Sequence, residues 1–175
     1  MESAILNTNS LAFIALCNEY CAAVEDVRES DKDDFVQSML RLLPRLYISA
    51  TDLKVEALDE EDAYLEPILD EDYYESVRCG IENLMGPEDI FLEVFEEDMK
   101  YSDTPIAASI SESLADLFQV LYNFVETIKN SPQTMIDVAL VAIKDDFASY
   151  WSQILCNVLR PLNQLSHSIG DENEY

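Results

Sequence analysis

SISESLADLFQVLYNFVETIKNSP, residues 109–132, carries a complete helix together with both of its ends. Ser109 and Glu112 match a capping box, in which each side chain accepts a hydrogen bond from the other residue's main-chain amide. The apolar side chains that follow recur every three or four positions, as on one face of a helix: Leu114, Leu117, Leu121, Phe124, Val125 and Ile128. The segment Asn130-Ser131-Pro132 ends this helix and begins the next one, with Ser131 as its N-cap.

Four further segments show the same helical spacing of apolar residues. One is expected to begin at Ser10 as its N-cap. A second begins after Asp31 and contains Pro44, which is expected to kink or divide it. A third spans about residues 70–85. The longest begins at Pro132 and repeats its apolar face over about eight turns.

The segments between these helices are short or irregular. Residues 55–69 hold a dense run of carboxylates with no basic residue, and we expect them to form a connecting loop. Residues 90–95 suit a short helix, and residues 99–108 suit an extended linker. The sequence therefore predicts an all-α protein, a single-domain antiparallel bundle of five long helices plus a short one. The domain is expected to cover residues 1–169, followed by a flexible C-terminal tail at 170–175.

Several segments resemble the bacterial family catalogued as domain of unknown function 5063. The resemblance rests on FIALCNEYC at 13–21, LLPRLY at 42–47, SESLADLFQ at 111–119, and Trp151, which in order and spacing cover most of the chain. It implies a helical fold and an uncharacterised function. It provides no catalytic residue that could be assigned to this chain.

The formal net charge is −26, from 36 acidic and 10 basic residues. Binding to nucleic acid or to an anionic membrane requires clustered Lys and Arg side chains, and the sequence shows no such cluster. We therefore expect no nucleic-acid partner and no membrane partner. An acidic surface is suited to a basic protein partner, and association with a second copy of the chain is the other partner that we consider.

Few residues are available for metal or cofactor chemistry. The three glycines cannot form a Gly-rich phosphate loop, and His167 is the only histidine, so zinc and di-iron sites lack their usual ligands. The carboxylates of residues 59–72 suit weak divalent-cation binding, but they lack the calcium-loop pattern. We expect no cofactor, no metal site and no catalytic residue.

The cysteines and the N-terminal region suggest a compartment. The four cysteines show no C-x-x-C pairing, and we expect buried, reduced thiols. The apolar run at 11–17 precedes Arg28, the first basic residue, which is the wrong order for a secretory signal. These features predict a cytoplasmic protein.

Two groups of residues are candidate sites. Ligand binding is predicted near the Pro44 kink, where two arginines one turn apart could hold an anion beside aromatic rings; the group is Arg41, Arg45, Tyr47, Tyr150 and Trp151. Partner binding is predicted at the tyrosines that lie among carboxylates: Tyr64, Tyr73 and Tyr74.

Two functions follow from these groups. The first is a non-enzymatic protein–protein interaction module. The alternative is a small-anion or divalent-cation binding protein, with or without enzymatic activity, whose pocket lies near Arg41, Arg45 and Trp151.

Overall fold

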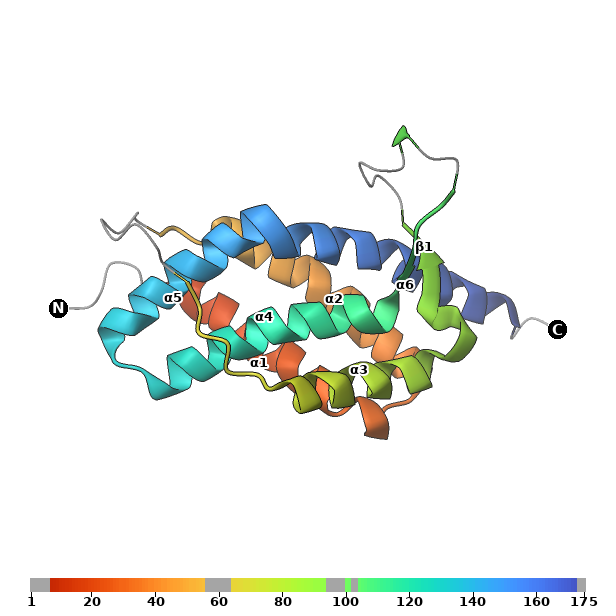
Figure 1. Ribbon diagram of the computed structural model, residues 1–175, viewed down its shortest axis with the longest axis horizontal. Coiled ribbons are helices and arrows are strands. Elements are labelled where there is room, and N and C mark those ends of the chain that lie inside the picture. Colours follow the sequence, from red (N-terminus) through yellow and green to blue (C-terminus); the bar gives the residue numbers. More distant parts are fainter. Residues whose placement is uncertain (1–6, 56–63, 94–99, 102–103, 173–175) are drawn as a thin grey trace.

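The computed structural model describes residues 7–55, 64–93, 100–101 and 104–172, and it shows a bundle of helices (Figure 1). Its α-helices are α1 (Thr8–Glu25), α2 (Lys32–Asp52), α3 (Glu71–Met85), α4 (Ile110–Asn130), α5 (Gln133–Asp146) and α6 (Ser152–Glu172). A π-helical turn, Phe147–Trp151, joins α5 to α6, and 3-10 turns lie at Val27–Glu29 and Gly86–Asp89. Within the described ranges, the sheet structure is one antiparallel pair, β1 (Ile90–Leu92) and β2 (Ala107–Ser109). The all-α prediction is therefore confirmed.

Helix α4 lies at the centre of the bundle, where it packs against α1, α3, α5 and α6 (Figure 1). Large buried aromatic residues join these helices. The ring centroid of Phe13 on α1 lies 5.5 Å from that of Phe124 on α4 and 6.2 Å from that of Trp151. Burial of each such side chain stabilises the fold by about 1.5–3 kcal/mol. Helices α1 and α4 and the π-turn therefore form one core.

Three helix starts agree with the sequence prediction, among them that of α3, whose N-cap is Asp70, and two others are shifted. The side chains of Asp31 and Ser109 cap α2 and α4 as predicted, and the bond from the Glu112 amide to Ser109 is one of the two bonds of the predicted capping box. Helix α1 instead begins at Thr8, because Asn7 is the N-cap and Ser10 makes the reciprocal hydrogen bond of the capping box. Helix α5 begins one residue later than predicted, because Pro132 itself has an extended backbone and occupies the N-cap position.

The predicted short helix at 90–95 is wrong where the structure describes it. Ile90–Leu92 is a strand, and it pairs with Ala107–Ser109 from the predicted linker. A three-residue strand depends on its partner strand, which is distant in sequence, so local spacing did not reveal it. Residues 94 and 95 lie outside the described residues.

Two prolines lie inside helices that nevertheless continue. Helix α2 runs through Pro44 without being divided, and α6 runs through Pro161. Helix α6 reaches Glu172, so it includes the first three residues of the predicted tail, and residues 173–175 lie outside the described part of the chain. None of the helices in that part combines the length and apolar character that a membrane span requires.

Two polar side chains attach irregular segments to α4. The Asp89 carboxylate accepts hydrogen bonds from the main-chain amide and the hydroxyl of Ser111, both at 2.7 Å, which fixes the start of β1 beside the start of α4. Asn123 Oδ1 accepts from the amides of Ile68 and Leu69, at 3.0 and 2.9 Å. These bonds hold the chain on both sides of α3 against the central helix.

Candidate functional site

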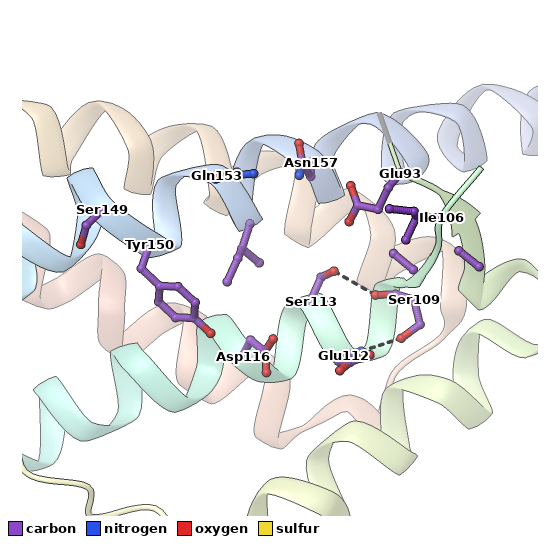
Figure 2. Close-up of a pocket in the computed structure, with 13 residues that line it drawn as sticks. Glu93, Ile106, Ser109, Glu112, Ser113, Asp116, Ser149, Tyr150, Gln153 and Asn157 are labelled. Atoms are coloured by element: carbon purple, nitrogen blue, oxygen red, sulfur yellow. Dashed lines mark hydrogen bonds between the residues drawn. The ribbon is translucent and has the colours of Figure 1, made fainter. Parts of the chain in front are cut away.

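A groove of about 390 Å³ lies between the first turns of α4, the two short strands and the beginning of α6 (Figure 2). Three carboxylates line it, from Glu93 after β1 and from Glu112 and Asp116 on α4. None of the thirteen lining residues is basic. The groove is therefore rich in hydrogen-bond acceptors and negatively charged.

Helix α4 presents its polar residues to the groove through its capped N-terminus. Ser109 Oγ accepts a hydrogen bond from the Glu112 amide at 3.2 Å, and the Ser113 hydroxyl donates to the Ser109 carbonyl at 2.9 Å. Glu112 and Asp116 are four residues apart and thus share one face of the helix. The cap therefore fixes the direction in which both carboxylates point.

The π-turn presents the opposite wall. The amide of Ser152 bonds to the carbonyl of Phe147, five residues earlier, which widens this turn. As a result Tyr150 lies in the groove, and Figure 2 shows its ring directed across the groove toward Asp116. The next residue, Trp151, is fully buried and donates its indole N–H to the Ile143 carbonyl at 3.1 Å.

The electrostatic field within the groove affects its titratable groups. Burial is the main cause that raises the pKa of Asp116, the nearby charge of Glu112 adds to it, and the hydrogen bond from Tyr74 opposes it. Burial also raises the pKa of Tyr150, and the charges of Asp116 and Glu112 raise it further. Each shift in pKa disfavours the negative form of the group. A positive charge in the groove would therefore interact favourably with all three side chains.

Several basic side chains are bound to main-chain carbonyls elsewhere in the fold. Lys144 Nζ donates to the carbonyls of Ala50 and Thr51 at the end of α2, at 2.6 and 3.2 Å. Lys32 Nζ donates to the Met85 carbonyl at the end of α3, and Arg160 donates to the Leu92 carbonyl. These cations donate hydrogen bonds to carbonyls at helix ends and at a strand edge, which lack a partner within their own element.

Carboxylates and cysteines are the described residues on which metal or thiol chemistry would depend. No group of three or more His, Cys, Asp or Glu side chains there is arranged to hold a metal ion. Cys17 and Cys21 are buried, and burial raises the pKa of Cys21 to about 12, so its thiol stays protonated. Cys156 is exposed, contrary to the prediction that all four cysteines are buried.

The predicted ligand site is not one pocket. Arg41 and Arg45 are exposed on α2, whereas Trp151 has no exposed surface that a ligand could contact. Tyr47 packs its ring edge against Phe147, with centroids 5.2 Å apart. The π-turn places Trp151 in the core, where its ring packs against Phe13 and Phe147. Of the five predicted residues, Tyr150 is the one that lines the groove.

The predicted partner-binding tyrosines have different roles. Tyr64 is 65% exposed, and its hydroxyl donates to Glu66 at 3.0 Å. Tyr73 packs edge-on against Phe118 and Tyr122 of α4, so it holds α3 in the bundle. The Tyr74 hydroxyl donates to Asp116 at 2.6 Å and thereby supports the floor of the groove.

Sequence reasoning did not assign Glu112 and Asp116 to a site. Glu112 and Asp116 follow Ser109 by three and seven residues, which places all three on one face of a helix. This spacing was the sequence signal that could have indicated an acidic site. The contribution of Tyr150, Gln153 and Asn157 from the other wall depends on how α6 packs on α4.

Comparison with known proteins gives the family. The model of the family described as "Domain of unknown function (DUF5063)" matches residues 4–168. The chain belongs to the DUF5063 family. A solved relative in fold, protein BF1032 from Bacteroides fragilis, has a TM-score of 0.79 and 23% sequence identity, over 93% of this chain and 95% of that one. At this identity the likeness concerns the fold. No curated protein matches this DUF5063 chain.

Proposed function

We propose that this protein is a non-enzymatic interaction module that binds a basic segment of another protein in the groove between α4 and α6. The observation that carries the proposal is the groove lining, which combines three carboxylates with no basic side chain. We also propose a cytoplasmic location, because four free cysteines suit a reducing compartment.

The charge of the whole chain supports this choice of partner. At a net charge of −26, the protein attracts positively charged segments over long distances and raises their association rate. Two copies of the chain repel each other for the same reason. Charge therefore favours a basic partner over a second copy.

The strands that border the groove carry exposed apolar side chains, and those of β1 lie on the face of the sheet opposite to Glu93. Ile90 and Leu92 alternate with the buried Phe91 on β1 and are 62% and 55% exposed. Ile106, which precedes β2, lines the groove itself. Interfaces between proteins combine apolar area with a polar rim. A partner segment that carries both basic and apolar residues fits this surface.

A titration with peptides tests the proposal. A short capped peptide of lysine and leucine residues is added to the isotope-labelled protein, and amide shifts are followed by NMR. We expect the largest shifts at Glu112, Asp116, Tyr150 and Ile106. We also expect Asp116→Asn combined with Glu112→Gln to weaken binding about tenfold or more, because each removed charge deletes a charge-assisted contact.

The matched control is a change of charge outside the groove. Glu19→Gln combined with Asp34→Asn removes two exposed carboxylates that do not line it, and this variant is expected to bind as the parent does. Equal weakening in both double variants would indicate nonspecific attraction and would contradict the proposal. A peptide with glutamate in place of lysine is expected to cause no shifts.

A further inference from the structure

We propose that the basic partner segment binds as an extended strand along the open edge of β2, which adds a third strand to the β1–β2 pair. This inference rests on the proposed function, because it takes the same partner and the same groove. It adds the conformation of the partner and the main-chain groups that recognise it.

The register of the sheet identifies the open edge. Leu92 faces Ala107 across the ladder, and the Glu93 amide bonds to the Ile106 carbonyl at 2.7 Å. In an antiparallel pair, hydrogen-bonded and non-hydrogen-bonded positions alternate. Leu92 and Ala107 are therefore a non-hydrogen-bonded pair, and the amide and carbonyl of each point away from the other strand.

The two outer edges of the sheet differ in what binds them. On β1, the Arg160 guanidinium donates to the Leu92 carbonyl, so α6 occupies part of that edge. On β2, no main-chain group in the described part of the chain pairs with the outer side of Ala107, because the sheet there has two strands. An unpaired strand edge is a template for another extended chain.

The open edge borders the groove. Ala107 and Ser109 of β2 belong to the groove lining, together with the carboxylates of Glu112 and Asp116. A strand added at Ala107 would place every second side chain on the face where Glu93 and Ala108 lie. Lysine or arginine at alternate positions would therefore reach the carboxylates, while the main chain pairs with β2. In strand addition of this kind, the main-chain hydrogen bonds provide affinity and the alternate side chains provide specificity.

Backbone chemistry separates this mode from simple charge attraction. The test uses three capped peptides with the same alternating lysine and threonine sequence: one is unmodified, and two are N-methylated at every second amide, each in one of the two alternate patterns. N-methylation removes main-chain donors and keeps the side chains and their charge. Because alternate amides point to opposite edges of an extended chain, the two methylated peptides cover both choices of the edge that pairs with β2. We expect one pattern to weaken binding at least about fivefold, since each lost bond contributes about 1 kcal/mol.

A change in the protein provides the second arm. Ala107→Pro removes the outward amide but no donor of the β1–β2 ladder, and it is expected to weaken the unmodified peptide to a similar extent. Hydrogen exchange of the Ala107 amide in the parent protein is expected to slow when the peptide binds. Circular dichroism and the β1–β2 amide shifts show whether Ala107→Pro remains folded.

The outcomes distinguish the two proposals. If binding depends on Glu112 and Asp116 but neither N-methylation pattern matters and the Ala107 amide keeps its exchange rate, strand addition is wrong and the proposed function stands. If the peptides do not bind at the groove, both fail. Slower exchange at Ala107 together with one sensitive methylation pattern supports strand addition.

Discussion

The Tyr74 hydroxyl and the Asp116 carboxylate lie 2.6 Å apart and join α3 to α4 beneath the acidic groove. Burial raises the pKa of Asp116, whereas the hydrogen bond from Tyr74 acts in the opposite direction. Tyr74 thus supports the charged form of a carboxylate that the surroundings disfavour. The second oxygen of Asp116 receives no hydrogen bond from the other described side chains, so it is available to a positively charged ligand.

Replacing Tyr74 with phenylalanine is expected to lower the free energy of unfolding by about 1 kcal/mol, because a partly buried carboxylate loses its donor. The same change should raise the pKa of Asp116, since Tyr74 lowers it in the parent protein. Urea denaturation measures the first effect and carbon-detected NMR titration the second.

The matched control is Tyr64→Phe. The Tyr64 hydroxyl also donates to a carboxylate, that of Glu66, but on the exposed surface. This change should leave the unfolding free energy unaltered, because water replaces the lost donor. An equal loss in both variants would show that burial of Asp116 has no energetic role.

The dependence of stability on pH should contain a contribution from Asp116. Its pKa is raised in the folded protein, so the folded state binds the proton more tightly than the unfolded state does. This contribution is fully present below about pH 4, the ordinary aspartate pKa, and is lost as the pH rises through the folded value. Asp116→Asn should remove this contribution. The unfolding free energy of the parent, relative to that of the variant, should therefore fall as the pH rises. The range from about pH 3 to about pH 7 brackets the ordinary aspartate pKa. A relative unfolding free energy that stays constant over this range would contradict the assignment to Asp116.

The helices were predictable because their signals are local. Asp31, Asp70 and Ser109 cap helices where their sequence positions indicate, and Gly86 ends α3 with a positive φ of 61°. The β1–β2 pair was not predictable, because its three-residue strands are fixed by pairing across 14 residues between Leu92 and Ala107. The burial of Asp89 was not predictable for the same reason, because it depends on a distant partner, Ser111 of α4.

The candidate site was predictable to a smaller extent. Tyr150 was among the predicted ligand residues, but its predicted neighbours Arg41 and Arg45 lie exposed on α2. The groove combines α4, the strands and α6, and no spacing within one segment shows which faces of separate helices meet. The basic partner that the net charge favours stays a prediction.

Lys144 is expected to stabilise the end of α2 through its bonds to the carbonyls of Ala50 and Thr51. Lys144→Met removes a cation from a helix C-terminus and takes one donor from each of these carbonyls, of which Ala50 keeps the Leu53 amide, so the unfolding free energy should fall by about 1–2 kcal/mol. Lys54→Met changes the net charge equally at an exposed position and should have a much smaller effect. Equal losses in the two variants would mean that net charge, and not the capping of α2, is the cause.

The π-turn accounts for the spacing of buried residues along the last helices. Ile143, Phe147, Trp151 and Leu155 are buried and lie four positions apart. In an α-helix each step of four turns the face by about 40°, so three steps would turn it by about 120°. The wider turn between Phe147 and Ser152 absorbs this rotation and keeps both helices directed at the core.

Deletion of Ser149 should therefore convert the π-turn into an α-helical turn without moving the core faces of α5 and α6. We expect the unfolding free energy to stay within about 1 kcal/mol of the parent, while Tyr150 leaves the groove wall and peptide binding weakens. Trp151 is the single tryptophan, so its fluorescence should remain typical of a buried indole. Deletion of Ala142 within α5 rotates the preceding face by about 100° and should expose the tryptophan or unfold the chain. If both deletions were equally destabilising, the wide turn would not be what aligns the two helices.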